Sequence, residues 1–250
     1  MNLLIDTGNS NIKLALSRSD DELYRKKHYA YRKENFREDL NKIFRSYSTE
    51  YIKPGEVTGI GIAVTNPVLK KILKDKFKKL NALFIENRTS PYVKINYQNK
   101  LGNDRVASIN AAQKIFGKEQ MLVIDLGTAT TLNLVINGEF IGGAIVPGIQ
   151  TGLNSLSSST PLPKTGVKFE NEIIFDNTRD SISSGTTQQT LFYLERAVNE
   201  LKKKHKSLYV ICTGGLSEYV SEHTDVIDAT DRDLVLKGIN IILNYYKDRK

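Results

Sequence analysis

Two short segments, half a chain apart, share one design and limit the possible folds more than any other feature. Each places an Asp-x-Gly turn between two apolar runs: Leu3–Leu16 reads LLIDTGNSNIKLAL, and Leu122–Val135 reads LVIDLGTATTLNLV. Asp6 of the first segment corresponds to Asp125 of the second, 119 residues further along a chain of 250. Either turn alone would fit an ordinary hairpin. Together they predict two similar domains, each with a strand–turn–strand unit that carries a carboxylate.

The second turn has the groups needed to hold a phosphate and its cation. It offers the Asp125 carboxylate, the backbone N–H groups of Gly127, Thr128 and Ala129, and several threonine hydroxyls. Glycine lets a ligand approach the backbone closely, and successive N–H groups in a turn form an anion-binding nest. We therefore predict phosphate binding at the paired turns.

Length and composition set the broad class of the protein. With 40% hydrophobic and 26% charged residues, the 250-residue chain can form one large globular domain or two of roughly 120 residues. No apolar run approaches the roughly 18 residues of a membrane span, and the chain opens on a predicted strand rather than an export signal. The single Cys212 excludes an intramolecular disulfide, and three scattered histidines disfavour a zinc site. We expect a cytoplasmic protein without a membrane partner.

A net charge of +8 raises the question of a nucleic-acid partner. Basic residues concentrate in Lys70–Lys79 (KKILKDKFKK) and Lys202–Lys206 (KKKHK). Ile72, Leu73 and Phe77 fall on one side of a helix through the first run, so its lysines would form the solvated face. No nucleic-acid-binding motif accompanies either run, and we expect no nucleic-acid partner. A basic surface would also attract an anionic substrate.

Apolar runs and helical spacings alternate along the chain, which predicts an α/β fold. Outside the second turn segment, strands are predicted at Asn2–Asp6, Ile12–Ser17, Leu23–Ala30, Val57–Val64, Leu83–Ile85, Glu139–Val146 and Leu208–Cys212. Helices are predicted at Glu34–Tyr47, Asn66–Leu80, Val106–Phe116, Pro147–Leu156, Thr187–Lys204 and Asp231–Tyr246. A break at Gly117-Lys118 gives domains 1–117 and 118–250, and leaves open that the last helix packs back on the first domain.

Two loops carry further candidate residues. The longest irregular stretch, Arg88–Leu101, is polar, and such connections are often functional. It leads into Asp104 at the start of a helix, where a carboxylate commonly serves as a cap worth about 1 kcal/mol. The residues alone leave Asp104 as either a cap or a functional group. Later in the chain, a strand runs into Thr213-Gly214-Gly215, an arrangement typical of ligand sites in α/β sheets.

Six motifs in a fixed order carry a resemblance to a known family. They are D-x-G-N-S (Asp6–Ser10), G-x-D-R (Gly102–Arg105), D-x-G-T-A (Asp125–Ala129), G-G-A-I-x-P-G (Gly142–Gly148), N-T (Asn177-Thr178) and T-G-G (Thr213–Gly215). The chain resembles type III pantothenate kinases over nearly its whole length. The two D-x-G turns alone fit any member of the acetate and sugar kinase, Hsp70 and actin superfamily. The G-x-D-R motif, followed about 20 residues later by D-x-G-T-A, is the more specific signal.

The resemblance implies a fold, a reaction and its partners. It implies two ribonuclease H-like domains with a nucleotide cleft between them. In that cleft ATP would phosphorylate the primary hydroxyl of pantothenate, the first step of coenzyme A biosynthesis. It also implies a divalent cation such as Mg²⁺, a monovalent cation (K⁺ or NH₄⁺), and a homodimer whose interface helps to build the pantothenate pocket.

The resemblance also implies roles for individual residues. ATP binding falls to Asp6, Thr7, Gly8, Asn9, Ser10, Asn11, Ile12, Lys13, Thr128, Gly214 and Gly215. Pantothenate binding falls to Tyr97, Gly102, Asn103, Asp104, Arg105 and Thr178, the last acting from the neighbouring subunit. Asp104 becomes the general base, Asp6 holds Mg²⁺ through water, and Asp125 binds the monovalent cation.

One position departs from the family pattern. The family usually places another Asp on the strand after the D-x-G-T-A turn, and this chain has Asn133 there. Asn keeps a carbonyl acceptor but lacks the negative charge, which weakens the expectation of a cation requirement. Two other functions remain open: a non-catalytic nucleotide-binding regulator, and another phosphate-handling member of the superfamily. The retained Asp6, Asp104 and Asp125 speak against the regulator.

Overall fold

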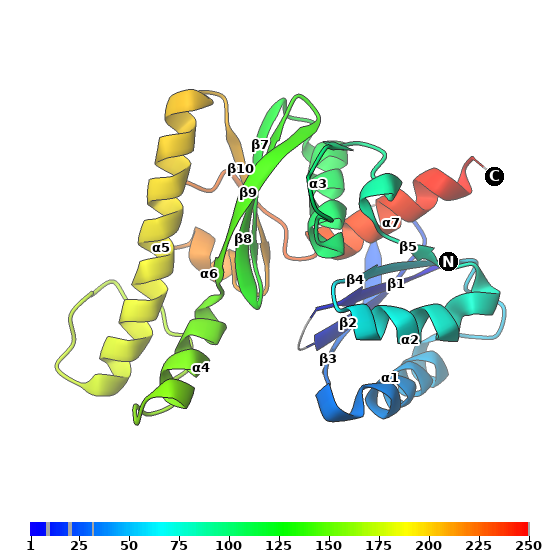
Figure 1. Ribbon diagram of the computed structural model, residues 1–250, viewed down its shortest axis with the longest axis horizontal. Helices are drawn as coiled ribbons and strands as arrows, with labels where there is room; N and C mark the ends of the chain where they lie inside the picture. The colour runs from blue at the N-terminus through cyan, green and yellow to red at the C-terminus, as the bar shows by residue number, and fades with distance from the viewer. Residues whose placement is uncertain (9–10, 20–21, 32, 250) are drawn as a thin grey trace. The chain divides into compact units, whose positions relative to one another are not determined.

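A computed structural model describes residues 1–8, 11–19, 22–31 and 33–249. Its internal contacts divide the chain into two compact units, Met1–Gly117 with Leu234–Lys250, and Lys118–Asp233 (Figure 1). The final helix therefore belongs to the first unit, which is built from two separate stretches of the chain.

The first unit is built on a five-stranded sheet in the order β3-β2-β1-β4-β5. Its strands are β1 (Asn2–Thr7), β2 (Asn11–Ser17), β3 (Leu23–Ala30), β4 (Gly59–Val64) and β5 (Leu83–Phe84). The first three form an antiparallel meander, whereas β4 runs parallel to β1 and β5 parallel to β4. Every residue of β1 is buried, as expected of a central strand covered on both faces.

Helices cover both faces of this sheet. The longer ones are α1 (Phe36–Tyr51), α2 (Pro67–Phe77), α3 (Asn103–Phe116) and α7 (Leu234–Lys247). Apolar residues of α1 and α2 pack with those of β1, β2 and β4 in one core. Helix α7 crosses the other face, over β1 and β4, and packs along α3. The polar stretch before α3 holds only a short 3-10 turn (Asn87–Thr89) and the two-residue strand β6 (Lys94–Ile95).

The second unit repeats this sheet topology. Its strands are β7 (Gln120–Leu126), β8 (Ala129–Ile136), β9 (Glu139–Pro147), β10 (Tyr209–Gly214) and β11 (Ala229–Thr230). Within the unit they lie in the order β11-β10-β7-β8-β9, with an antiparallel meander followed by two parallel strands. Helices α4 (Ile149–Ser159), α5 (Thr178–Lys204) and α6 (Ser217–Ser221) cover one face. The predicted fold class, α/β with two domains of similar design, is confirmed.

Several predicted boundaries are wrong. Helix α1 ends at Tyr51 rather than Tyr47, α4 ends at Ser159 rather than Leu156, and α7 begins at Leu234 rather than Asp231. Helix α5 begins at Thr178, nine residues before the predicted Thr187, because Asn177 caps it by accepting the Asp180 N–H at 3.0 Å. Polar side chains in the added part of the helix contact the 166–173 segment. For example, the Ser184 hydroxyl donates to the Glu172 carbonyl. Strand β4 begins at Gly59 rather than Val57.

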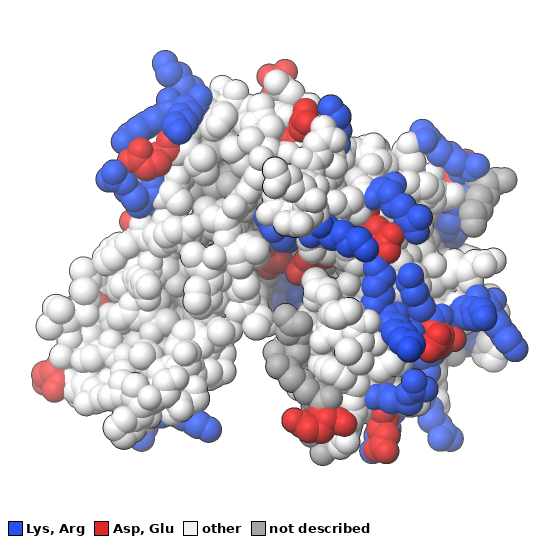
Figure 2. Space-filling model, in the orientation of Figure 1, with Lys and Arg blue, Asp and Glu red and all other residues white. Residues whose placement is uncertain are grey.

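The lysine-rich run forms the solvated face of α2, as predicted. Leu69, Leu73 and Phe77 are buried under the helix, while Figure 2 shows basic side chains gathered over this part of the first unit. Asn66 accepts the Val68 and Leu69 N–H groups and so caps the helix. Among the residues described, no helix combines the length and apolar content needed to cross a bilayer.

Candidate active site

The first Asp-x-Gly turn joins β1 to β2 and holds an ion pair. Asp6 and Lys13 lie opposite each other in the antiparallel register, with 3.7 Å between Lys13 Nζ and Asp6 Oδ2. Asp6 is 8% exposed, and the Gly8 N–H closes the turn by donating to the Asn11 carbonyl at 3.0 Å. The predicted ligands Asn9 and Ser10 lie outside the described residues.

The start of α3 brings a second carboxylate to the same sheet edge. The Asn103 amide donates to the carbonyl of Val64 at 2.8 Å, which fixes α3 to the carboxyl end of β4, next to β1. Asp104 is the second residue of the helix, and its Oδ1 accepts the Arg105 N–H at 2.8 Å. A Cβ added at Gly102 would lie 2.6 Å from that oxygen, so glycine leaves room for the carboxylate.

Burial perturbs both carboxylates. It raises the pKa of Asp6 to about 6; Lys13 opposes this shift, and the negative charge of Asp104 adds to it. Burial likewise raises the pKa of Asp104, against the backbone N–H and positive charge of Arg105. A buried carboxylate and a partly buried one that repel each other favour the arrival of a cation or a proton.

Arg105 and Tyr97 form a second cluster beside Asp104. Burial lowers the pKa of the Arg105 guanidinium, and a hydrogen bond with Tyr97 and the charge of Asp104 oppose this. An arginine keeps its charge under such shifts, since its ordinary pKa lies far above neutrality. The Tyr97 side chain is 43% exposed. The pair thus offers a fixed positive charge and an accessible ring to an anionic ligand.

In the second unit, two glycine turns close around Asp125. Asp125 lies at the end of β7, opposite Thr131 of β8 and Thr213 of β10. Gly214 adopts φ +100°, and a Cβ there would lie 2.8 Å from Asp125 Oδ1 and 2.6 Å from the Leu126 carbonyl oxygen. Only glycine fits this position, because both the backbone angle and the space exclude a side chain.

The surroundings of Asp125 suit a cation bound by oxygen atoms. In the described part of the chain, the buried Thr213 hydroxyl beside it has no hydrogen-bond partner. Asn133 is fully buried on the same face, and its amide nitrogen donates to the Val123 carbonyl and the Thr131 hydroxyl, both at 3.1 Å. A carboxylate with an unpaired hydroxyl nearby fits a monovalent cation, and Asn133 contributes no charge.

Thr128 lies exposed at the tip of the second turn. Its carbonyl accepts the Gly148 N–H at 3.0 Å and the Thr151 hydroxyl at 2.6 Å. A Cβ at Gly148 would lie only 2.1 Å from the Gly127 carbonyl oxygen, so this glycine permits the close approach of the chain. Gly215, by contrast, is exposed, and a Cβ added there would meet nothing within 4 Å.

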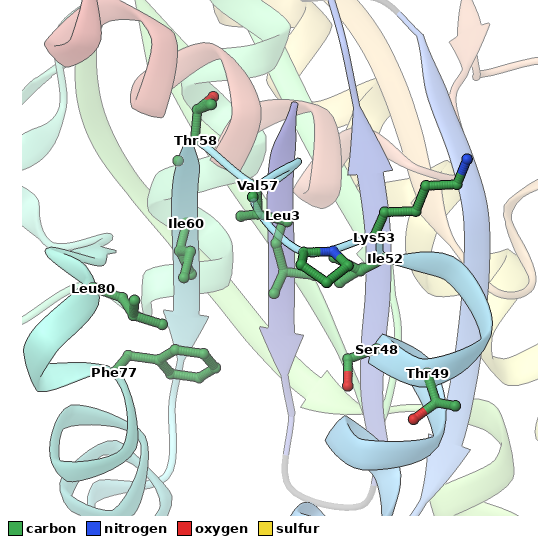
Figure 3. A pocket seen from close by; sticks show the side chains of 13 residues that line it. Leu3, Ser48, Thr49, Ile52, Lys53, Val57, Thr58, Ile60, Phe77 and Leu80 are labelled. Atoms are coloured by element: carbon green, nitrogen blue, oxygen red, sulfur yellow. The ribbon is translucent and has the colours of Figure 1, made fainter.

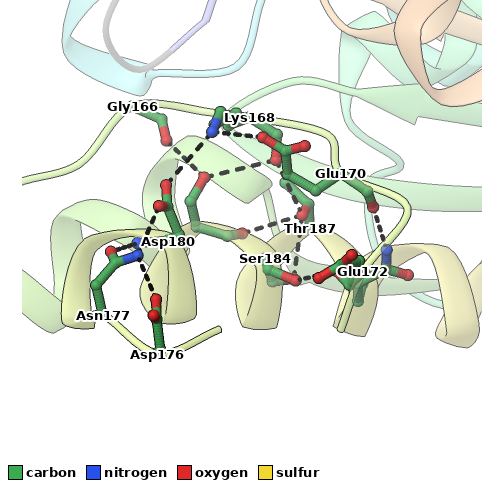
Figure 4. Close-up of polar contacts among 11 residues, drawn as sticks. Gly166, Lys168, Glu170, Glu172, Asp176, Asn177, Asp180, Ser184 and Thr187 are labelled. Carbon is green, nitrogen blue, oxygen red and sulfur yellow. Dashed lines mark hydrogen bonds and ion pairs between the residues drawn. The ribbon is translucent and has the colours of Figure 1, made fainter. Parts of the chain in front are cut away.

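The other predicted ligands divide into accessible and buried side chains. Ile12 is fully buried in the first core, and the Thr7 hydroxyl donates to the Ala63 carbonyl, so neither side chain is available to a nucleotide. Thr178 is exposed at the first turn of α5. Figure 4 shows the polar contacts at this end of α5, where Lys168 pairs with Glu170 at 2.5 Å and with Asp180 at 3.4 Å.

Sequence reasoning missed two hydroxyls that touch the turns. The Tyr31 hydroxyl donates to the Gly8 carbonyl, and Thr151 donates to that of Thr128. No motif contains either residue, and contacts between separate elements leave no local signal.

A cavity of about 530 Å³ lies elsewhere, at the opposite end of β1 beside Leu3, Ile60 and Phe77 (Figure 3).

Comparisons with known proteins identify a family for this chain. A family model for type III pantothenate kinase matches residues 2–200. The type III pantothenate kinase of Petrotoga mobilis is 31% identical over 220 residues, 85% of this chain and 79% of its own. That of Fervidobacterium nodosum is 30% identical over 255 residues, 100% of this chain and 98% of its own.

A solved structure has a similar fold. A Baf family protein from Campylobacter jejuni superposes with a TM-score of 0.65 at 22% identity, over 98% of this chain and 99% of its own. Both the family match and the curated relatives span most of the sequence. The chain belongs to the type III pantothenate kinase family.

Proposed function

We propose that this protein transfers the γ-phosphoryl group of ATP to the primary hydroxyl of pantothenate. The products are 4'-phosphopantothenate and ADP, which makes the reaction the first step of coenzyme A biosynthesis. The observation that carries the proposal is the buried Asp6 beside the partly buried Asp104, two carboxylates whose negative charges repel each other, in a member of this kinase family. Such a pair offers one group to a metal ion and the other to a proton.

Asp104 is the proposed general base. Its carboxylate accepts the proton of the pantothenate hydroxyl as the oxygen attacks the γ-phosphorus and ADP leaves. The raised pKa improves the match to this task, since a base with a pKa nearer neutrality accepts a proton more readily. The contact with the Arg105 N–H holds one carboxylate oxygen and leaves the other for substrate.

Asp6 and Lys13 are proposed to neutralise the phosphates. Mg²⁺ usually keeps several waters and binds through one or two carboxylates plus phosphate oxygens, which suits the buried Asp6. Lys13 is 3.7 Å from Asp6, and its side chain is 37% exposed, so it is available to a phosphate oxygen.

The remaining ligands are proposed from the same geometry. Arg105 and Tyr97 would bind the anionic and polar ends of pantothenate. In the second unit, Thr128, Gly214 and Gly215 would contact the nucleotide. Asp125, with the Thr213 hydroxyl, would hold K⁺ or NH₄⁺, which adds positive charge near the phosphates.

The predicted cytoplasmic location stays a prediction.

A homodimer is part of the proposal. Exposed apolar side chains lie shortly before and along α5: Ile173 is 52% exposed, Ile174 82% and Phe192 48%. Exposed apolar groups of this kind are common at protein interfaces. The nearby Thr178 would then reach pantothenate in the partner subunit. Sedimentation of the wild-type protein and of Ile174→Glu tests this: the variant should shift toward monomer and show a higher KM for pantothenate, and a monomeric wild type would contradict the dimer.

The reaction is tested by coupled ADP release from the purified protein. We expect release that depends on pantothenate; release driven by glucose or polyphosphate instead would contradict the assignment.

Asp104→Asn should lower kcat by roughly 10²- to 10⁴-fold while nucleotide binding persists, and near-normal turnover would reduce Asp104 to a structural role. Rates in sodium, potassium and ammonium salts test the cation site, and equal rates in all three would count against it.

A further inference from the structure

Each Asp-x-Gly turn is held from outside by a side-chain hydroxyl. In the first unit, the Tyr31 hydroxyl donates to the Gly8 carbonyl. Tyr31 follows the last residue of β3, Ala30, which pairs with Asn11 at the start of β2 and so brings Tyr31 beside the turn. Its ring is 8% exposed and packs edge-on against Phe36, with 5.0 Å between ring centroids. The hydroxyl is thus aimed by a rigid, buried ring.

The charge of Asp6 reaches the same hydroxyl. Burial raises the pKa of Tyr31, and the Asp6 carboxylate raises it further. Tyr31 therefore stays protonated at neutral pH and remains a donor. A donor that ties down Gly8, two residues from Asp6, stabilises the backbone next to that carboxylate.

In the second unit, Thr151 plays the corresponding part. It lies in the first turn of α4, and its hydroxyl donates to the Thr128 carbonyl at 2.6 Å. The Gly148 N–H donates to the same oxygen at 3.0 Å, so both hydrogen-bonding sites of this carbonyl are used. The close approach of Gly148 brings α4, and with it Thr151, onto the turn.

Holding the carbonyls sets the direction of the N–H groups. The peptide unit is planar and trans, so its C=O and N–H point in opposite directions. Fixing the Thr128 carbonyl toward α4 turns the Ala129 N–H away from it, and the Tyr31 hydroxyl fixes the direction of the Gly8 carbonyl. A phosphate nest requires its N–H groups to converge while its carbonyls point elsewhere.

We infer that Tyr31 and Thr151 are positioning residues: the hydroxyl of each orients the turn of its own unit to bind phosphate groups of a magnesium–nucleoside triphosphate. The inference rests on the proposed kinase function. Neither side chain needs to touch the nucleotide. Loss of either hydroxyl should weaken nucleotide binding and leave the pantothenate site unchanged.

Tyr31→Phe is the first test, with Tyr47→Phe as its matched control. Both variants keep a buried ring and remove a hydroxyl that donates to a backbone carbonyl; that of Tyr47 bonds to Arg25 at 2.9 Å, on β3. One hydrogen bond of ordinary strength corresponds to a factor of roughly five to ten. We expect Tyr31→Phe to raise KM for MgATP by that factor with KM for pantothenate unchanged, and Tyr47→Phe to change neither.

Thr151→Val is the second test, with Thr160→Val as its control. The Thr160 hydroxyl donates to the Leu156 carbonyl, also at 2.6 Å, at the far end of α4. We expect the same selective rise in KM for MgATP with Thr151→Val alone. This pair keeps the inference testable even where Tyr31→Phe fails to fold, since the two turns belong to different units.

Binding of a non-hydrolysable ATP analogue with Mg²⁺, measured by calorimetry, separates this inference from the proposed function. If the wild type shows no pantothenate-dependent turnover but the two variants still bind the analogue five- to tenfold more weakly than their controls, the inference holds and the function fails. If the variants bind and turn over like wild type, or if both KM values rise together with those of the controls, the positioning role is overturned.

Discussion

At the residue scale, the charged form of Asp6 that the proposed function needs is the form that burial destabilises. Its pKa of about 6 in the folded protein lies above the ordinary 3.8, so the folded state holds the proton more tightly than the unfolded chain does. The contribution of Asp6 to stability is therefore fully present below pH 3.8 and is lost as the pH rises toward 6, where the buried charge must form. The ionised carboxylate that a metal ion needs thus destabilises the apoprotein at neutral pH.

Asp6→Asn should raise the free energy of unfolding at pH 7 by roughly 1–3 kcal/mol and remove the fall in stability between pH 4 and 6. Lys13 is partly exposed, so it stays hydrated without its partner. Urea unfolding of both proteins at pH 4 and pH 7 measures the difference. Asp75→Asn, at an exposed carboxylate of α2, is the control and should change little. A variant less stable than wild type at pH 7 would contradict the argument.

Gly102 is expected to matter through the space it leaves. Alanine can adopt the φ of −53° that Gly102 has, so the substitution does not strain the backbone. Its Cβ would lie 2.6 Å from Asp104 Oδ1, so the carboxylate would have to move. Gly102→Ala should lower kcat at least tenfold and change the free energy of unfolding by less than about 1 kcal/mol. Gly166→Ala, where nothing lies within 4 Å, is the control. Equal kcat values in the two variants would show that Asp104 tolerates displacement.

The sequence predicts the candidate residues that stand in motifs better than it predicts the residues that contact them from other elements. Asp6, Asp104 and Asp125 stand in motifs whose spacing is visible along the chain. Tyr31 and Thr151 act across elements, and only the fold shows which carbonyl each hydroxyl meets. The pKa of Asp6 likewise depends on burial and on Asp104, almost a hundred residues away in the chain.

Among the elements, α7 and α3 pack against each other at close range. A Cβ at Gly238 of α7 would lie 2.0 Å from the carbonyl oxygen of Ala107 and 2.5 Å from its carbonyl carbon, both in the α3 backbone. Backbone cannot rotate aside as a side chain can, so the helices would have to separate. Helix α3 begins with Asn103, Asp104 and Arg105, and its displacement would reach the candidate site.

Gly238→Ala should therefore destabilise the protein by several kcal/mol, against the usual gain of up to about 1 kcal/mol for alanine within a helix. Gly185→Ala in α5 is the matched control, because nothing lies within 4 Å of its added carbon and helix propensity alone should act. Thermal unfolding of both variants shows the contrast. A Gly238→Ala protein as stable as wild type would mean that the two helices can move apart freely.

Strands and most helices were predictable because their apolar periodicity is local. The start of α5 was not, since its first two turns are rich in serine and threonine, which favour caps and turns when no tertiary partner is present. In the folded protein those hydroxyls bond to the carbonyls of Gly166, Lys168 and Glu172. The helix is thus stabilised by a loop that the sequence places before it.

At the level of the whole molecule, the first unit depends on both ends of the chain. The buried Asn2 amide at the start of β1 donates to the side-chain oxygens of Asn240 at 2.9 Å and Asn244 at 2.7 Å, and Lys247 donates to the Asn2 side chain at 3.0 Å. The Asn240 amide in turn donates to the Ser17 hydroxyl at 3.0 Å. This buried network fixes α7 in one register on the sheet. By contrast, Lys118–Asp233 forms the second unit from one continuous segment.

A chain that ends at Asp233 should consequently lose the first unit and keep the second. Without α7, Asn2 loses its partners, and the face of β1 and β4 that Ile239 and Leu243 help to cover is exposed to water. Each buried polar group left unpaired costs about 1–3 kcal/mol, before the loss of apolar burial is counted. Hydrogen exchange measured by mass spectrometry should show fast exchange in β1 and β4 and continued protection in β7 and β10. Equal protection in both sets of strands would mean that residues 1–117 fold without the C-terminal helix, and the network at Asn2 would then serve only to seat that helix.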